Sequence, residues 1–256
     1  YPSLFVFFTA PAYIYDIEKI INRRVTVTFQ SGYAYDVNTY VGRGVLQTTS
    51  RMIDEMRLAW RKHIVRQKIY SKAVMDSFVD DWFSNGAENG MMGLIFANVL
   101  KRATETCNRK FYLFQHLPNY GFDLYLSDVE HLVNTFGELN STCGNTPVTI
   151  EYSRGLGTET FQDYQGGNHT IDSVSPLNPA FVLIIPPNNP DGSIFTTGAE
   201  ENRICDFVYH YKSYYETDIP YIPCSSFAIS THKVFHGGLR NGFSFWKNSE
   251  LTPYFN

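Results

Sequence analysis

Apolar residues spaced three and four positions apart predict one long helix in the first half of the chain. From about residue 48 to residue 83 the sequence has neither glycine nor proline, and its apolar residues recur with the helical period. Thr49 or Ser50 can cap the start, and Asp54 lies in the first turn. The other side of this helix is basic and is expected to face solvent.

Three more helices are expected. Residues 91–107, MMGLIFANVLKRATETC, are apolar almost all round, which is typical of a buried central helix. Residues 128–139 form a shorter amphipathic pattern, capped by Ser127 or Asp128, and residues 16–24 predict a short helix with Asp16 as its N-cap.

Short runs rich in aromatic and β-branched residues predict strands. In the first half these are residues 3–8, 25–30, 110–117 and 122–127. After Cys143 the predicted strands are residues 146–153, 178–187, 203–215, 225–230 and 243–246, separated by loops of Gly, Pro and Asn.

These elements predict an α+β fold, because helices dominate the early part of the chain and strands the later part. We expect the helix-rich N-terminal half, with its helices at about 48–83 and 91–107, to pack on a mostly antiparallel, strand-rich C-terminal half. The 256 residues suit one domain, 1–256. A subdomain division is possible near 140–146, between a helix-rich 1–140 and a strand-rich 146–256.

Charge and hydropathy make two classes of partner unexpected. The net charge is -4, and the 21 Lys and Arg are dispersed apart from the patch between Arg51 and Lys72, so nucleic-acid binding is not expected. No apolar run reaches the roughly 18–20 residues that a membrane-spanning helix needs. Charged residues are 18% and aromatic residues 16%, with 18 Tyr and 20 Phe. This composition suggests an aromatic, weakly charged surface that contacts a protein partner or another copy of the chain.

The four cysteines, Cys107, Cys143, Cys205 and Cys224, allow three disulfide pairings. Pairing nearest neighbours, 107 with 143 and 205 with 224, would close two local loops, and each bond would contribute roughly 3–4 kcal/mol in the chain-entropy model. The other interpretation is four buried thiols in a reducing compartment.

Two sequons predict N-linked glycans at Asn140 and Asn168. Asn140 lies in the polar loop ELNSTCGNTP, three residues before Cys143. With the even number of cysteines, this loop predicts a secreted or lumenal protein.

The stretch STHKVFHGGLRNG carries two histidines four residues apart, His232 and His236. In a strand these two lie about 13 Å apart at roughly 3.3 Å per residue, too far to share one metal ion. We therefore expect no metal site. His232 could serve as a general base beside Lys233 and Arg240, which could hold an anion. Alternatively the stretch is a hairpin whose glycines allow positive φ.

The stretch EYSRGLGTETFQD brings Glu151 and Glu159 close together in the sequence. Paired carboxylates are the catalytic groups of glycoside hydrolysis, so these residues complete a candidate His and carboxylate site. A polar loop rim with an Arg–Glu pair is the alternative.

No long nucleotide-binding or nucleophile motif is present. We therefore predict a secreted or lumenal domain that binds or has a structural role through an aromatic surface, with no cofactor. One alternative is a hydrolase that uses His232, His236, Arg240, Glu151 and Glu159. Another is a viral or particle-forming structural protein.

Overall fold

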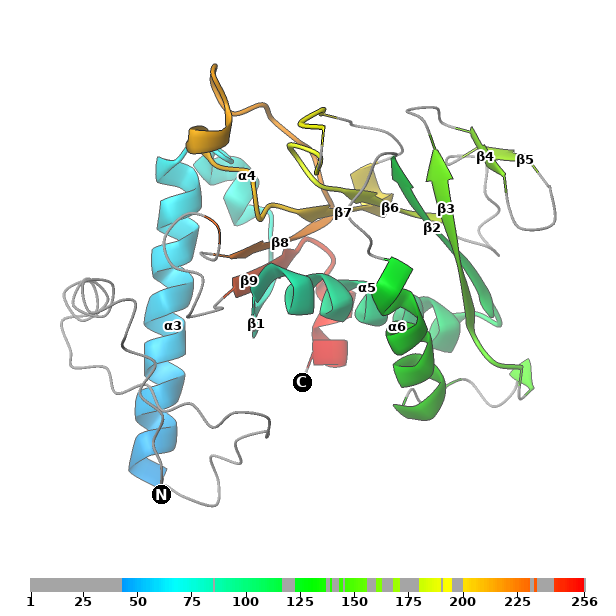
Figure 1. The fold of residues 1–256 in the computed structure, drawn as a ribbon. Helices are drawn as coiled ribbons and strands as arrows, with labels where there is room; N and C mark the ends of the chain where they lie inside the picture. Colours follow the sequence, from blue (N-terminus) through cyan, green and yellow to red (C-terminus); the bar gives the residue numbers. More distant parts are fainter. Residues whose placement is uncertain are drawn as a thin grey trace, which may run out of the picture.

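The computed structural model describes residues 43–84, 86–116, 123–136, 139, 143–144, 146–155, 160–162, 168–170, 180–189, 191–194, 200–230, 233 and 242–255. The expected elements at 3–8, 16–24 and 25–30 lie outside these residues. A seven-stranded sheet is the centre of the fold, with helix α3 on one face and helices α5 and α6 on the other (Figure 1).

The strand order across this sheet is β1-β9-β8-β7-β6-β2-β3. Bounds along this order are Asp80–Ser84, Gly242–Trp246, Ser226–Ser230, Arg203–Asp206, Ala180–Ile184, Lys110–His116 and Thr149–Gly155. A separate antiparallel pair is formed by β4 (Thr160–Gln162) and β5 (Asn168–Thr170).

Most of the sheet is parallel, so the prediction of a mostly antiparallel half is wrong. Pairings from β8 through β7, β6 and β2 to β3 are all parallel, and only β9 runs antiparallel to its neighbours β1 and β8. The physical reason is burial on both faces. Parallel strands covered by helices on each side are apolar along their whole length, as AFVLI in β6 is.

The long predicted helix is two helices and a strand. Helix α3 spans Arg43–Arg66, α4 spans Lys72–Asp76, and β1 follows. Lys68 adopts a φ of 61°, in the left-handed region, which a continuing helix cannot accommodate. The apolar residues beyond this turn matched the helical period, but Trp82 belongs to a strand that pairs with β9.

Other boundaries also differ from the predictions. Helix α5 spans Gly86–Glu105 and begins five residues before the expected helix at 91–107. Helix α6 spans Asp123–Phe136. Residues 123–127 are therefore helical, although they were expected to be part of a strand at 122–127. The expected strand at 203–215 is a strand only as far as Asp206, and a 3-10 turn, η3 (Lys212–Tyr214), follows.

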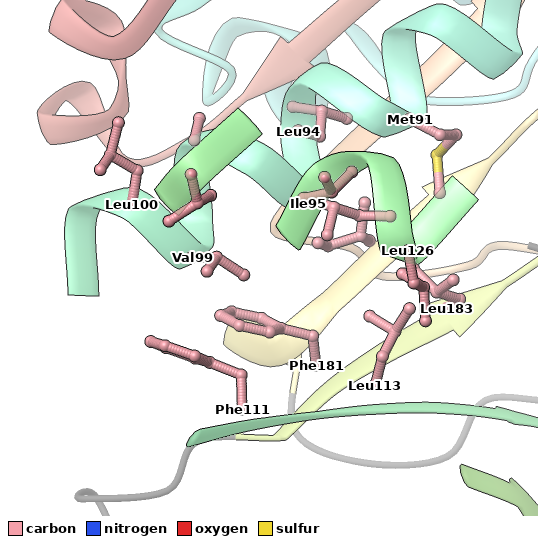
Figure 2. Close-up of a cluster of buried hydrophobic side chains, with 14 of the residues drawn as sticks. Met91, Leu94, Ile95, Val99, Leu100, Phe111, Leu113, Leu126, Phe181 and Leu183 are labelled. Atoms are coloured by element: carbon pink, nitrogen blue, oxygen red, sulfur yellow. The ribbon is translucent and has the colours of Figure 1, made fainter. Parts of the chain in front are cut away.

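Two apolar cores lie on the two faces of the sheet. In Figure 2, Phe111 and Leu113 of β2 and Phe181 of β6 point toward α5, where Leu94 and Ile95 contact the same cluster. On the other face Trp60 and Ile64 of α3 pack with Phe227, Phe243 and Phe245 of β8 and β9. Adjacent residues of a strand thus face different cores, which fixes the face on which each polar residue lies.

Disulfides join Cys107 to Cys143 and Cys205 to Cys224. Strands from before residue 140 and after residue 146 pair in the same sheet, since β1 pairs with β9 and β2 with β3 and β6. The subdomain division near 140–146 stays a prediction. Asn168 begins β5, whereas Asn140 lies outside the described residues, and glycosylation at both also stays a prediction.

Candidate functional site

Buried polar residues gather where the parallel strands end. Strands β1, β8, β7, β6 and β2 run in one direction, so their carboxyl ends share one edge of the sheet. At or just after these ends lie five buried polar residues: Ser84, Gln115, Asn188, Asp206 and Ser230. In open sheets of parallel strands, ligands bind outside this edge.

Asp206 is the last residue of β7 and is 6% exposed. Ile204, two residues earlier, belongs to the core under α5, so the Asp206 side chain lies on the same face. One carboxylate oxygen, Oδ1, accepts a hydrogen bond of 2.9 Å from the backbone N–H of Val208. Burial raises the pKa of this carboxyl to about 7, although that hydrogen bond and the positive charge of Lys233 act to lower it.

Lys233 follows the neighbouring strand β8 by three residues and is exposed. Its ammonium lies 5.5 Å from the centre of the Tyr209 ring, close enough for a cation–π contact. Tyr209 lies three residues after Asp206 on the same segment. The sheet therefore brings an amine and a buried acid to one edge from two adjacent parallel strands.

The amino end of α5 closes the site from a third direction. Strand β9 begins at Gly242, where a Cβ atom would lie 2.8 Å from the carbonyl carbon of Gly86 and 2.9 Å from the carbonyl oxygen of Ile229. Only glycine allows so close an approach. Gly86 itself has a φ of 89°. Glu88, in the first turn of this helix, raises the pKa of Asp206 further, so its carboxylate is also near.

Ser230 ends β8 between these groups and is 1% exposed. Within the described part of the chain, its hydroxyl oxygen has no hydrogen-bond partner. A buried hydroxyl without a partner costs free energy, so this oxygen is suited to hydrogen-bond a bound molecule.

A rigid turn follows β6 at the same edge. The backbone N–H of Asn188 donates to the carbonyl of Ser193 at 2.7 Å, and its side-chain amide donates to Asp191 at 3.0 Å. Ser193 also donates to Asp191 through its hydroxyl, at 2.7 Å. These bonds hold Asn188, which is 6% exposed, in a turn four residues after the end of β6.

Among the residues predicted from sequence to be catalytic, only Glu151 is described. It lies in the first half of β3, near the amino end of the strand, and forms an ion pair of 2.7 Å with Lys110 at the start of β2. The other four, His232, His236, Arg240 and Glu159, lie outside the described residues. The catalytic role of all five stays a prediction.

Sequence reasoning missed the pair Asp206 and Lys233. Lys233 lies in the stretch STHKVFHGGLRNG, whose histidines suggest catalysis, and there the sequence indicates only an anion-binding role for the lysine. The available signal was positional. RICD and SSFAIS both lie in segments predicted to be strands; an acid ends the first, and a lysine follows the second by three residues.

Within the described ranges, no three or more His, Cys, Asp or Glu side chains are placed to hold a metal ion. In the same residues, no helix has the length and apolar character needed to cross a membrane.

No family model matches the chain, and no curated protein matches it. Solved structures do show a similar arrangement, at low identity. One is a sphingosine-1-phosphate lyase from Burkholderia pseudomallei, with 11% identity and a TM-score of 0.48, covering 77% of this chain and 44% of the other.

A second is a PLP-dependent aminotransferase from Streptococcus suis, with 15% identity, a TM-score of 0.40 and coverage of 75% of this chain and 47% of the other. A third, from Escherichia coli, has a methionine aminotransferase function, with 12% identity, a TM-score of 0.43 and coverage of 78% and 49%. The chain thus spans about half the length of the structures it matches.

The prediction of a secreted or lumenal binding or structural domain is therefore corrected. The structures named above are a lyase and two aminotransferases, and none of them is a structural protein or a hydrolase. Most of the largest fully buried side chains are aromatic, among them Trp246, Tyr70, Phe207 and Phe227, so they fill the two cores. Partners, glycosylation and compartment stay predictions.

Proposed function

We propose that the chain is part of an enzyme that uses pyridoxal phosphate to act on a small amino compound. The observation that carries the proposal is the placement of Lys233 and Asp206 after two adjacent parallel strands, at the edge where α5 begins. Enzymes of this chemical class hold their cofactor through a lysine amine and an acid that faces the ring nitrogen.

Lys233 would bind the aldehyde of the cofactor through its amine. A lysine amine must be deprotonated to attack a carbonyl carbon, and it must reach the site without being buried in the core. Lys233 meets the second condition because it is exposed and its side chain extends over the Tyr209 ring. The cation–π contact holds the ammonium against that ring.

Asp206 would pair with the ring nitrogen. Its pKa of about 7 means that burial makes the ionised form costly in the free protein. With the cofactor bound, the Asp206 carboxylate would be stabilised in its ionised form by the positive charge of the ring nitrogen. The N–H of Val208 keeps one carboxylate oxygen in place for this pairing.

The phosphate would lie at the amino end of α5. This helix is 20 residues long, so its first N–H groups and its dipole favour an anion. The close approach of Gly86 and Gly242 leaves no side chain between the helix and β9 at this point. The hydroxyl of Ser230, buried and without a partner in the described residues, is a further donor at this edge.

When bound, pyridoxal phosphate withdraws electrons from the carbon next to a substrate amine, and the protein decides which bond to that carbon breaks.

Titration of the protein with pyridoxal phosphate, followed by absorbance, tests the proposal. Borohydride reduction and peptide mass spectrometry then identify the modified residue. We expect saturable binding with one modified lysine, Lys233, and loss of the absorbance change in Lys233→Ala. The matched control is Lys212→Ala, which removes an exposed lysine of the same region. Labelling spread over many surface lysines, or equal binding by Lys233→Ala, would refute the proposal.

A further inference from the structure

Two tyrosines that follow Asp206 hold the backbone around Lys233. The hydroxyl of Tyr211 donates to the carbonyl oxygen of Ser230 at 2.8 Å, and this bond is buried. The hydroxyl of Tyr214 donates to the carbonyl oxygen of Lys233 itself at 3.3 Å. These two bonds fix the first and last residues of the segment that leads from β8 to the lysine.

We propose that Tyr211 and Tyr214, the tyrosine clamp, are positioning residues that hold the Lys233 amine in register with the Asp206 carboxylate. The inference rests on the proposed function, and it adds to it a mechanism by which one segment sets the geometry of the whole site. Neither hydroxyl needs to touch the cofactor, because both act through backbone carbonyls.

The clamp is built on a segment that cannot easily change shape. Backbone N–H groups of Tyr211 and Tyr214 donate to the carbonyls of Tyr209 and Tyr211, at 2.8 and 2.9 Å, which tightens the chain into consecutive turns. The ring of Tyr214 packs edge-on against Tyr209, with 5.5 Å between ring centres. Tyr209 in turn lies under the lysine ammonium, so Lys233 is contacted on its side chain and on its backbone.

The ends of this segment are tied together as well. The Cys205–Cys224 disulfide joins the residue before Asp206 to a residue two positions before β8. The backbone N–H of Phe207 donates to Ala228 of β8 at 2.8 Å and extends the pairing of the two strands past Asp206. The segment that follows Asp206 is thus joined to β8 in two places. Near Asp206 it is joined by the disulfide and by the Phe207–Ala228 hydrogen bond, and further along it is joined by the hydroxyls of the two tyrosines.

This arrangement has a chemical consequence. The Lys233 amine and the Asp206 carboxylate would both contact one rigid cofactor. Binding is therefore favoured when the distance between the two groups already matches the cofactor in the free protein. With the clamp intact, little ordering remains to be done when the cofactor binds. Without one of the hydroxyls the lysine backbone gains freedom in the free protein, and binding becomes weaker because that freedom is lost on binding.

The experiment compares Tyr211→Phe and Tyr214→Phe with a matched control, Tyr70→Phe. Tyr70 is also buried, and its hydroxyl also donates to a backbone carbonyl, that of Ile222, at 2.6 Å. The control therefore loses the same kind of bond, but at a carbonyl that lies before β8 and outside the segment from Ser230 to Lys233. The measurements are the Kd for pyridoxal phosphate by absorbance titration, the fraction of Lys233 labelled after borohydride, and amide hydrogen exchange of the peptide spanning residues 226–233.

We expect the Kd to rise roughly fivefold in Tyr214→Phe and roughly tenfold in Tyr211→Phe, the range that one net hydrogen bond gives. Exchange of the 226–233 peptide should be faster in both, and neither effect should appear in Tyr70→Phe. Equal Kd values and equal exchange in all three variants would overturn the clamp. If the wild-type protein bound no pyridoxal phosphate while exchange still rose only in the clamp variants, the proposed function would fall and the mechanical role of the clamp would stand.

Discussion

Asp206 and Lys233 are electrostatically coupled across the ends of two adjacent strands, since the positive charge of Lys233 lowers the pKa that burial of Asp206 raises. Burial has the larger effect, and the pKa of Asp206 is about 7. An acid this costly to ionise weakens the fold at neutral pH. Residues kept at such a cost are typical of functional sites.

Asp206→Asn should therefore stabilise the free protein at pH 8 while it abolishes tight binding of pyridoxal phosphate. The folded pKa lies above the unfolded value of 3.8, so the folded state binds more protons and stability falls as pH rises from about 4 to about 7. Asparagine removes this loss, which is at most about 4 kcal/mol. Thermal unfolding at pH 5 and pH 8 measures the change. A lower Tm in the variant at pH 8 would contradict this account.

His210 should give the opposite pH dependence. It is fully buried, and burial lowers the pKa of its ring to about 3. The unfolded state therefore takes up a proton first, and stability is lost as pH falls from 6.5 toward 3. In the wild-type protein this slope partly cancels that of Asp206 between pH 4 and 6.5.

Replacing either Asp206 or His210 should leave the pH dependence of stability that the other residue causes. Asp206→Asn should gain stability with rising pH in this window, by up to roughly 1.4 kcal/mol per pH unit. In the wild-type protein, Nδ1 of His210 lies 2.6 Å from the Tyr215 hydroxyl, and His210→Gln keeps a polar partner for that hydroxyl. The stability of this variant should fall with rising pH. Urea unfolding at half-unit pH steps checks both, and parallel pH profiles for the two variants would show that these residues do not control the dependence.

The sequence predicted the existence of most described elements but not their pairing direction or their ends. The helix at 91–107 and the strands at 110–117, 178–187, 225–230 and 243–246 correspond to α5, β2, β6, β8 and β9. Direction is set by connections between distant segments, which periodicity does not report. The turn at Lys68 was hidden because a lysine at positive φ has no local sequence signal.

The site was harder to predict than the fold because its members are far apart in the sequence. Glu88, Asp206 and Lys233 share one edge only after β1, β7 and β8 are placed in the sheet. Sequence reasoning looked for residues that are neighbours in the chain, such as His232 and His236. Strand ends were the better guide, since an acid at the end of a buried strand is costly to ionise unless it is paired.

Removal of Arg61 should destabilise the protein strongly. Its guanidinium donates to Asp81 at 3.0 and 3.2 Å and to the carbonyls of Met75 and Phe78, while Asp81 is only 6% exposed. Burial raises the pKa of Asp81, and Arg57 and Arg61 offset that effect only in part. Arg61→Met leaves the carboxylate with one cation fewer, and we expect a loss of about 3 kcal/mol.

Lys72→Met is the matched control for this variant. Lys72 pairs with Asp76, but both side chains are mostly exposed, so the change should be below about 0.5 kcal/mol. Urea denaturation of both variants measures the difference. Equal losses would show that burial of Asp81 does not determine the strength of its ion pairs.

The two disulfides should be detectable in the protein purified without reductant. Intact mass should rise by about four hydrogens on reduction, and peptide mapping should recover Cys107 with Cys143 and Cys205 with Cys224. Replacing Cys205 and Cys224 by alanine should cost about 3 kcal/mol, because the bond closes a loop across 19 residues. An unchanged mass would mean that the cysteines are reduced and would remove the main support for an oxidising compartment.

Gly90 and Ser244 should show a strong interaction in a double-mutant cycle. A Cβ on Gly90 would lie 2.5 Å from the Ser244 hydroxyl oxygen and 3.0 Å from Ala228, so Gly90→Ala pushes α5 away from the sheet and should cost about 1–3 kcal/mol. Ser244→Ala removes a hydroxyl that is fully buried and lacks a partner in the described residues, so that variant alone should be neutral or slightly stabilising.

Together the two changes relieve the nearest clash. Chemical denaturation should therefore show that the double variant is at least about 1 kcal/mol more stable than the sum of the single effects. Additive losses would instead locate the strain at Ala228 and Ser84, whose positions the second substitution does not change.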